Sequence, residues 1–174
     1  PAYVQEADLL QPSFDPTSTT GEADLFARRD ESPTVPAGAA DGSFLNRADS
    51  GLAALASPVV LVLEGDLDAD RDVLTVLAAA KAKGHPLVLV APDVSDRALS
   101  TLRANTLTGR VRTLPVLLAD LTQRRRVVAL TGGRLVPSDD LSSGWLPDEV
   151  WGECAGWICD LDDSWVIGEL STDR

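Results

Sequence analysis

Residues 58–136 contain blocks of apolar positions that switch between the period of a strand and the period of a helix. Residues 58–63 (PVVLVL) are an unbroken, β-branched apolar run, which is typical of a strand buried on both faces. Residues 86–90 repeat this pattern, and residues 111–118 form a third run that Pro115 interrupts. We therefore predict three buried strands, followed by a short fourth strand at residues 134–136.

Helical periodicity fills the segments between these strands. Asp70 can cap the first helix and Gly84 ends it, whereas Ser95 caps the second helix and Gly109 ends it. A third helix is predicted over residues 119–130. The recurring apolar positions are Val73, Leu74, Leu77 and Ala80 in the first helix and Ala98, Leu99, Leu102 and Leu107 in the second. Helices that alternate with buried strands indicate an α/β fold with a parallel βαβα core.

The two flanking regions have a different character. Residues 156–159 and 165–167 predict a C-terminal pair of short strands around the Asp-rich turn at residues 160–164. Residues 22–51 are rich in Ala, Gly, Asp, Ser and Pro and predict a long mobile loop. The apolar residues that can anchor this loop are Leu25, Phe26, Phe44 and Leu45. We expect residues 1–174 to form a single domain in which residues 22–51 are a flexible insertion.

The charge balance argues against two classes of partner. The chain has 27 acidic and 15 basic residues and a formal net charge of -12. Nucleic acids and anionic membranes both require clustered Lys and Arg, so neither is an expected partner. No apolar stretch reaches the roughly 18 residues that a membrane-spanning helix needs. The first eight residues contain no basic region followed by an apolar one, so we predict a cytoplasmic protein without a signal peptide.

The residues that commonly bind metals or act as bases are few. His85 is the only histidine, and its position between Gly84 and Pro86 predicts an exposed turn. Cys154 and Cys159 are interpreted as small buried hydrophobic residues, and their spacing does not imply a disulfide. With one distant histidine and no second cysteine pair, we predict no metal site and no cofactor.

Three short motifs resemble known sites but fail on their spacing. The acidic series Glu64, Asp66, Asp68 and Asp70 begins like a calcium loop, but counting from Asp66 the sixth and twelfth positions are not Gly and Glu. Residues 131–134 (TGGR) lack the spacing of a phosphate loop and predict a tight turn. The basic run at residues 124–126 is interpreted as a solvated helix face. We therefore predict no catalytic residue, and hence no enzyme.

The order of these segments resembles the apical domain of group I chaperonins, the bacterial GroEL family. The segments that carry the resemblance are residues 73–91 (VLTVLAAAKAKGHPLVLVA), Asp93-Val94, residues 98–102 (ALSTL), Asn105-Thr106, Gly109 and residues 130–133 (LTGG). Leu9 to Phe14 resemble the extended segment that begins that domain, and Asp160 to Gly168 resemble the strand pair near its end. The equatorial, nucleotide-binding domain has no counterpart here.

The resemblance implies a domain in which two helices flank a groove that captures apolar segments of unfolded polypeptides and the mobile loop of a co-chaperonin. The full-length protein would then form a ring. The implied groove residues are Leu9, Ser13, Phe14, Leu74, Leu77, Leu99, Arg103, Ala104 and Asn105. Arg103 and Ala104 stand where the family has two valines, which predicts a less apolar groove and weaker or narrower binding.

The residues themselves leave alternatives open. Periodicity alone favours a core position for Leu74, Leu77 and Leu99, whereas the resemblance favours the groove for Leu74 and Leu99 and leaves Leu77 undecided. A second hypothesis is a specialised interaction module that kept the fold but lost general chaperone activity. A third is a doubly wound enzyme with a polar pocket near Glu64 or Asp93, although neither a glycine-rich loop nor a base supports it.

Overall fold

Two β-sheets organise the part of the chain that the structure, a computed structural model, describes: residues 24–47 and 49–168. The larger sheet has six strands in the order β2-β6-β5-β4-β7, with β8 paired to β4 on its β7 side. Its strands are β2 (Gly38–Ala39), β4 (Val59–Leu63), β5 (Leu87–Ala91), β6 (Thr113–Leu117), β7 (Leu135–Val136) and β8 (Gly152–Glu153). Strands β6, β5, β4 and β7 run parallel, which confirms the predicted α/β fold with a parallel core.

The second sheet is antiparallel and has the order β1-β10-β9-β3. Its strands are β1 (Thr34–Val35), β3 (Ala53–Ala56), β9 (Gly156–Cys159) and β10 (Ser164–Ile167). The strands β9 and β10 pair from Ser164 opposite Cys159 to Ile167 opposite Gly156. This hairpin is the C-terminal strand pair that the sequence predicted.

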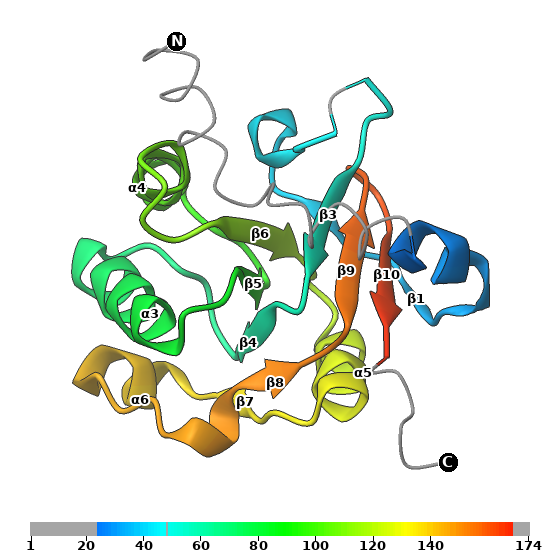
Figure 1. Cartoon of the computed structure of the whole chain (residues 1–174). Coiled ribbons are helices and arrows are strands. Elements are labelled where there is room, and N and C mark those ends of the chain that lie inside the picture. Colours follow the sequence, from blue (N-terminus) through cyan, green and yellow to red (C-terminus); the bar gives the residue numbers. More distant parts are fainter. Residues whose placement is uncertain (1–23, 48, 169–174) are drawn as a thin grey trace, which may run out of the picture.

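Helices cover both faces of the larger sheet (Figure 1). The helices α3 (Asp70–Lys83), α4 (Asp96–Leu107) and α6 (Ser138–Ser143) lie on one face, and α5 (Leu121–Thr131) and the antiparallel sheet lie on the other. Helix α3 contacts both α4 and α6. The remaining helical segments are residues 24–28, η1 (Arg29–Glu31), η2 (Gly42–Phe44) and η3 (Asp148–Val150). The result is a layered molecule in which α3 and α4 are outer elements.

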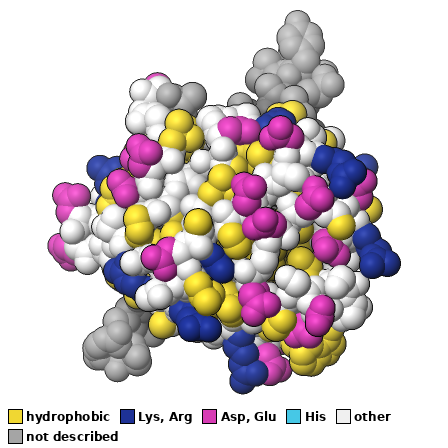
Figure 2. Space-filling view, turned by 180° about the vertical axis from the view of Figure 1, so that it is seen from behind, with side chains coloured by type: hydrophobic (Ala, Val, Ile, Leu, Met, Phe, Trp, Pro, Cys, Tyr) yellow, Lys and Arg dark blue, Asp and Glu magenta, His cyan; other side chains and the backbone are white. Residues whose placement is uncertain are grey.

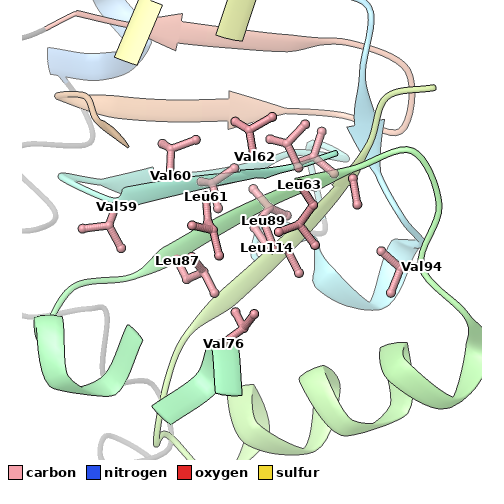
Figure 3. Packing of buried hydrophobic residues seen from close by; sticks show 14 of the residues in the cluster. Val59, Val60, Leu61, Val62, Leu63, Val76, Leu87, Leu89, Val94 and Leu114 are labelled. Carbon is pink, nitrogen blue, oxygen red and sulfur yellow. The ribbon is translucent and has the colours of Figure 1, made fainter. Parts of the chain in front are cut away.

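The core lies between the helices and the two sheets. Every residue of β4 and β5 is buried, because these central strands are covered on both faces. Figure 3 shows Val60 and Val62 on one face of β4, and Val59 and Leu61 on the face toward which Val76 of α3 points. This packing explains why the two segments are continuous apolar runs.

The predicted helix ends agree with the structure except at Asp70. Gly84 ends α3 in the left-handed conformation, at φ 76°, and the Ser95 side chain accepts a hydrogen bond from the Ala98 amide at 3.2 Å. Asp70 does not cap α3; it is the first helical residue, and Ala69 precedes it without a side-chain cap. Gly109 lies just beyond α4, which ends at Leu107.

Residues 22–51 were expected to be a long mobile loop, and their described part contains two short strands and helical turns. The flexibility of this insertion stays a prediction. The segment contributes β1 to one sheet and β2 to the other, through the pairs Thr34–Trp165 and Gly38–Leu117. Of its expected anchors, Leu25 and Phe44 are buried, but Val35 is buried as well. Both strands have only two residues, and their partners lie far along the chain, so no local periodicity indicated them.

Pro115 does not interrupt β6. It lies opposite Leu89 of β5, and its carbonyl accepts a hydrogen bond from the Ala40 amide at 2.9 Å on the β2 side. The nitrogen of Pro115 therefore points toward the β2 side of β6, beyond the two paired residues of β2. Because proline has no N–H to donate, no hydrogen bond is lost there, and the bonds between β6 and β5 are unaffected.

Candidate functional site

Helices α3 and α4 lie side by side on the outside of the larger sheet, and they carry most of the implied groove residues (Figure 1). Leu74 of α3 is 57% exposed. Leu77 and Leu99 are only 5% and 8% exposed and pack in the main core cluster. Leu77 and Leu99 therefore lie in the core and not in an open groove, where the resemblance placed Leu99, whereas Leu74 is available at the surface.

The outer side of α4 is mixed in polarity. Ala104 is exposed, Arg103 and Asn105 are half-buried, and Leu107 at the end of the helix is 67% exposed. The Asn105 side chain donates a hydrogen bond to the Thr101 carbonyl at 3.2 Å, one helical turn back. A polypeptide lying on this side of α4 would meet apolar groups together with a cation.

Arg103 joins α4 to the segment around η2. Its guanidinium Nη2 lies 2.6 Å from Asp41 Oδ2, its Nε donates to the Ser43 hydroxyl at 2.8 Å, and its Cζ lies 5.4 Å from the centre of the Phe44 ring. Asp41 is the N-cap of η2, where its carboxylate accepts a hydrogen bond from the Ser43 amide. The cation of Arg103 is therefore paired and lies over an aromatic ring.

The electrostatics of Asp41 reflect this arrangement. Burial by itself raises the pKa of the Asp41 carboxyl, but the hydrogen bonds from Ser43 and the charge of Arg103 outweigh it, so the net pKa is lowered. The carboxylate is thus held in its charged form, and the α4–η2 contact is an ion pair across the physiological pH range.

We use the name α3–α4 surface for the solvent-facing parts of these two neighbouring helices, which include Leu74 on α3 and Arg103, Ala104 and Asn105 on α4, with η2 next to Arg103. Sequence reasoning missed the η2 residues Asp41 and Ser43 and treated Phe44 only as a loop anchor. A signal was present, since Asp41 followed by Gly-Ser-Phe is a typical cap before an apolar residue. The extended segment assigned from the resemblance falls elsewhere: Leu9, Ser13 and Phe14 lie outside the described residues.

The basic run at residues 124–126 was interpreted as a solvated face, and for Arg124 this is wrong. Arg124 is buried, and its guanidinium donates to the carbonyls of Leu118, Ala119 and Glu64 at 2.9, 2.8 and 3.0 Å. Arg125 and Arg126 are exposed, as expected. Arg124 therefore ties the start of α5 to the end of β4.

This contact lies at the position where a doubly wound enzyme would bind its ligand. The strand order reverses between β4 and β7, and ligands of such folds bind outside the carboxyl ends of the strands at this point. Here Arg124 bonds to Glu64, and the Ser138 hydroxyl would lie 2.5 Å from a Cβ added at Gly65. A second bridge links Leu67 to Asp93 through its amide at 3.0 Å. The hypothesis of a polar pocket near Glu64 or Asp93 gains no support.

Other candidate groups are placed as follows. His85 is exposed. Cys154 and Cys159 are both buried, and burial raises the pKa of the Cys159 thiol to about 12. Among the described residues no group of three or more His, Cys, Asp or Glu side chains is arranged to hold a metal ion, and no helix is long and apolar enough to cross a membrane.

Acidic side chains are distributed over the molecular surface. Figure 2, which views the molecule from behind, shows Asp and Glu interspersed with Lys, Arg and apolar groups. Beside the α3–α4 surface, Arg97 of α4 pairs with Asp68 at 3.6 Å and with Asp70 at 3.4 Å. The acidic series before α3 is therefore partly neutralised by the neighbouring helix.

Comparison with solved structures identifies the fold as chaperonin-like. The chain matches the chaperonin gp146 from the bacteriophage EL 2 (Pseudomonas aeruginosa) with a TM-score of 0.61 and 16% sequence identity, over 80% of this chain and 28% of that one. A second crystal form of the same chaperonin gives a TM-score of 0.58 at 16% identity, over 80% of this chain and 29% of that one. No protein-family model matches the chain. The chain thus spans less than a third of the length of that chaperonin.

Proposed function

We propose that the chain is a polypeptide-binding domain of a chaperonin or chaperonin-like protein, equivalent to the apical domain, and that it captures apolar segments on the α3–α4 surface. The observation that carries the proposal is the exposure of Leu74 on an outer helix of a chaperonin-like fold. A leucine that is 57% exposed contributes little to folding, but it gains free energy when a partner covers it.

The clients would be unfolded or partly folded polypeptides, and a co-chaperonin mobile loop is a further candidate ligand. In this proposal the chain carries no catalytic centre, since any ATPase activity would reside in an equatorial domain. A ring-shaped full-length assembly and a cytoplasmic location also belong to the proposal.

The proposal includes narrow or weak binding. Of the three leucines implied to line the groove, Leu77 and Leu99 are buried in the core, so a client would contact Leu74 alone. Arg103 adds a paired cation to the same surface. A generic unfolded chain would therefore bury less apolar area here than on a groove lined by several exposed aliphatic side chains.

The same observations favour one alternative, a specialised interaction module that kept the fold and lost general chaperone activity. Such a module would contact its partner through a surface on which the Arg103 cation is already paired with Asp41. It would bind little hydrophobic dye and little denatured protein. Binding of a hydrophobic dye therefore separates the two readings: strong binding favours the chaperone and weak binding favours the module.

The decisive experiment compares two exposed leucines. We expect Leu74→Ser to reduce the affinity for a denatured client, whereas Leu161→Ser, at a site of similar exposure (52%) on the β9–β10 turn, should not. Full burial of a leucine is worth about 1.5–3 kcal/mol, and the 57% exposed fraction of Leu74 scales this to about 0.9–1.7 kcal/mol, or about a 4- to 18-fold loss of affinity. Equal affinities for the wild type, Leu74→Ser and Leu161→Ser would refute the assignment of this surface.

A further inference from the structure

Trp145, in the turn after α6, holds its ring in solvent and is 59% exposed. Tryptophan is usually well buried, because its ring is a large apolar surface. The chain on either side of it is anchored, since Leu141 is buried and Leu146 packs on the main core cluster. The exposed ring is therefore a feature of an ordered turn.

Two backbone hydrogen bonds fix this turn. The Gly144 amide donates to the Leu141 carbonyl at 3.0 Å, and the Trp145 amide donates to the Asp140 carbonyl at 2.9 Å. With Gly144 at φ 81°, these bonds form a Schellman motif, in which the residue at the position of Trp145 commonly packs on an apolar residue in the last turn of the helix. Here Asp139 and Asp140 stand at the corresponding helix positions, so the helix offers the ring no apolar partner.

Two other tryptophans show what commonly covers a ring in this molecule. The guanidinium carbon of Arg29 lies 5.1 Å from the centre of the Trp165 ring, and the Lys83 ammonium nitrogen lies 5.5 Å from the centre of the Trp151 ring. Among the described residues, Trp145 has no cation over its ring and no hydrogen bond from its indole nitrogen. The face of this ring is open to a cation from another molecule.

The charges around Trp145 favour such a cation. Residues 137–149 include four acidic residues and no Lys or Arg. The two acids that follow Trp145 are paired with cations of other elements, whereas Asp139 and Asp140 form no ion pair in the described part of the chain. The net charge of -12 adds a long-range attraction for basic partners.

We propose that Trp145, Asp139 and Asp140 form a docking site for a basic segment of a partner protein, with an arginine of that segment stacked on the Trp145 ring. Tryptophan is the aromatic residue that attracts a cation most strongly, and the planar guanidinium of arginine stacks on aromatic faces. The two carboxylates would attract further cations of the same segment. Helix α6 contacts α3 (Figure 1), but this site does not depend on client capture at the α3–α4 surface.

The test is an NMR titration of the chain, labelled with nitrogen-15 in its tryptophans, with an unstructured Gly/Ser peptide that carries several arginines. The indole N–H signal of Trp145, assigned by its absence in Trp145→Leu, should shift in a saturable way, and binding should weaken as salt increases. The same peptide with citrulline in place of arginine keeps the side-chain shape without the charge. We expect it to bind at least about fivefold more weakly.

Matched variants assign the binding to the turn. Trp145→Leu keeps an apolar side chain but removes the aromatic face, and it should weaken binding of the arginine peptide by about 2- to 5-fold, the effect of an exposed cation–π contact. The pair Asp139→Asn and Asp140→Asn should weaken binding by about twofold or more. The pair Asp162→Asn and Asp163→Asn changes the net charge equally, on the β9–β10 turn, and should leave binding close to that of the wild type.

Several outcomes would overturn the proposal: an unmoved Trp145 indole signal, equal binding of the arginine and citrulline peptides, wild-type affinity in Trp145→Leu, or equal effects of the two Asp pairs. If Trp145→Leu fails to fold, the comparison of the two peptides on the wild type decides alone. Leu74→Ser should leave binding of the arginine peptide intact, so this proposal and the polypeptide-binding proposal fail independently.

Discussion

Replacing Arg103 by valine tests how the α3–α4 surface balances stability against client binding. The substitution removes the ion pair with Asp41, the hydrogen bond to Ser43 and the contact with the Phe44 ring. It also places an apolar side chain next to Ala104, on the side of α4 that a client would contact. We therefore expect Arg103→Val to lower the stability of the domain and to raise its capture of denatured protein.

The structure sets the size of the stability loss. The Arg103 and Asp41 side chains are 34% and 38% exposed, so solvent screens their attraction in spite of the 2.6 Å separation. A pair of this kind contributes about 0.2–1 kcal/mol, and a cation over an aromatic ring at such a site adds about 0.5–1 kcal/mol. The expected loss is about 1–2 kcal/mol, which lowers Tm by roughly 2–8 °C in a domain of this size.

Urea unfolding and capture of a denatured substrate measure the two effects on the same preparations. A double-mutant cycle with Asp41→Asn isolates the pair, and the coupling energy should shrink as salt increases. The matched control is Arg97→Val, which removes an exposed cation from the same helix away from η2. Capture by Arg103→Val that equals wild-type capture would refute the idea that Arg103 limits client binding, and an unchanged stability would refute the energetic value given to the α4–η2 contact.

The remaining expectations concern stability and reactivity. Leu99→Ala should cost about 2–5 kcal/mol of unfolding free energy while leaving client affinity per folded molecule unchanged, as urea unfolding and binding assays will show. Cys159 should resist alkylation at pH 8 in the folded protein, because burial raises its pKa to about 12, and labelling faster than global unfolding would contradict this. Gly38→Ala should destabilise the domain strongly, since the new Cβ would collide with the backbone of Leu161, and a wild-type Tm would rule the clash out. The lowered pKa of Asp41 stabilises the fold above the unfolded-state pKa of about 3.9, so the stability advantage of wild type over Asp41→Asn should disappear as pH falls through the folded-state pKa.

The parallel core could be read from the sequence because its signals are local. A β-branched run that is apolar at every position is explained by burial on both faces, and β4 and β5 have this burial throughout. Gly84 and Ser95 marked helix ends through their own backbone and side-chain chemistry. Strands β1 and β2 carry no such signal, because each has two residues and pairs only with strands that the chain reaches more than 70 residues later.

The site was harder to predict because helical periodicity shows which residues lie on the same side of a helix, but not which side packs against the rest of the protein. The buried residues of α3 are Val73, Val76, Leu77 and Ala80, and Leu74 lies off this stripe. If Val76 had been counted among the apolar positions of this helix, the buried side would have been centred on Val73, Val76, Leu77 and Ala80, and Leu74 would have been assigned to the surface. For Arg124 the signal was also present, since Arg124, Val127 and Thr131 are the buried positions of α5 and share one side of that helix.

The carboxyl ends of the parallel strands, near Arg124, and the outer side of helices α3 and α4 are two different places where this fold could bind a ligand. In a parallel sheet the strand carboxyl ends usually leave a crevice where the strand order reverses, and side chains there are free to bind a ligand. In this chain Arg124 donates to three carbonyls at that edge, and the Ser138 hydroxyl occupies the space where a Cβ at Gly65 would lie. The proposed client surface lies away from this edge, on the outer side of α3 and α4, where Leu74 is 57% exposed. The substitution Arg124→Met tests this separation, because it leaves three carbonyls at the strand edge without their hydrogen-bond donor. We expect a loss of several kcal/mol of unfolding free energy, on the order of 1–3 kcal/mol for each carbonyl that water cannot reach. The affinity for a client, per folded molecule, should not change.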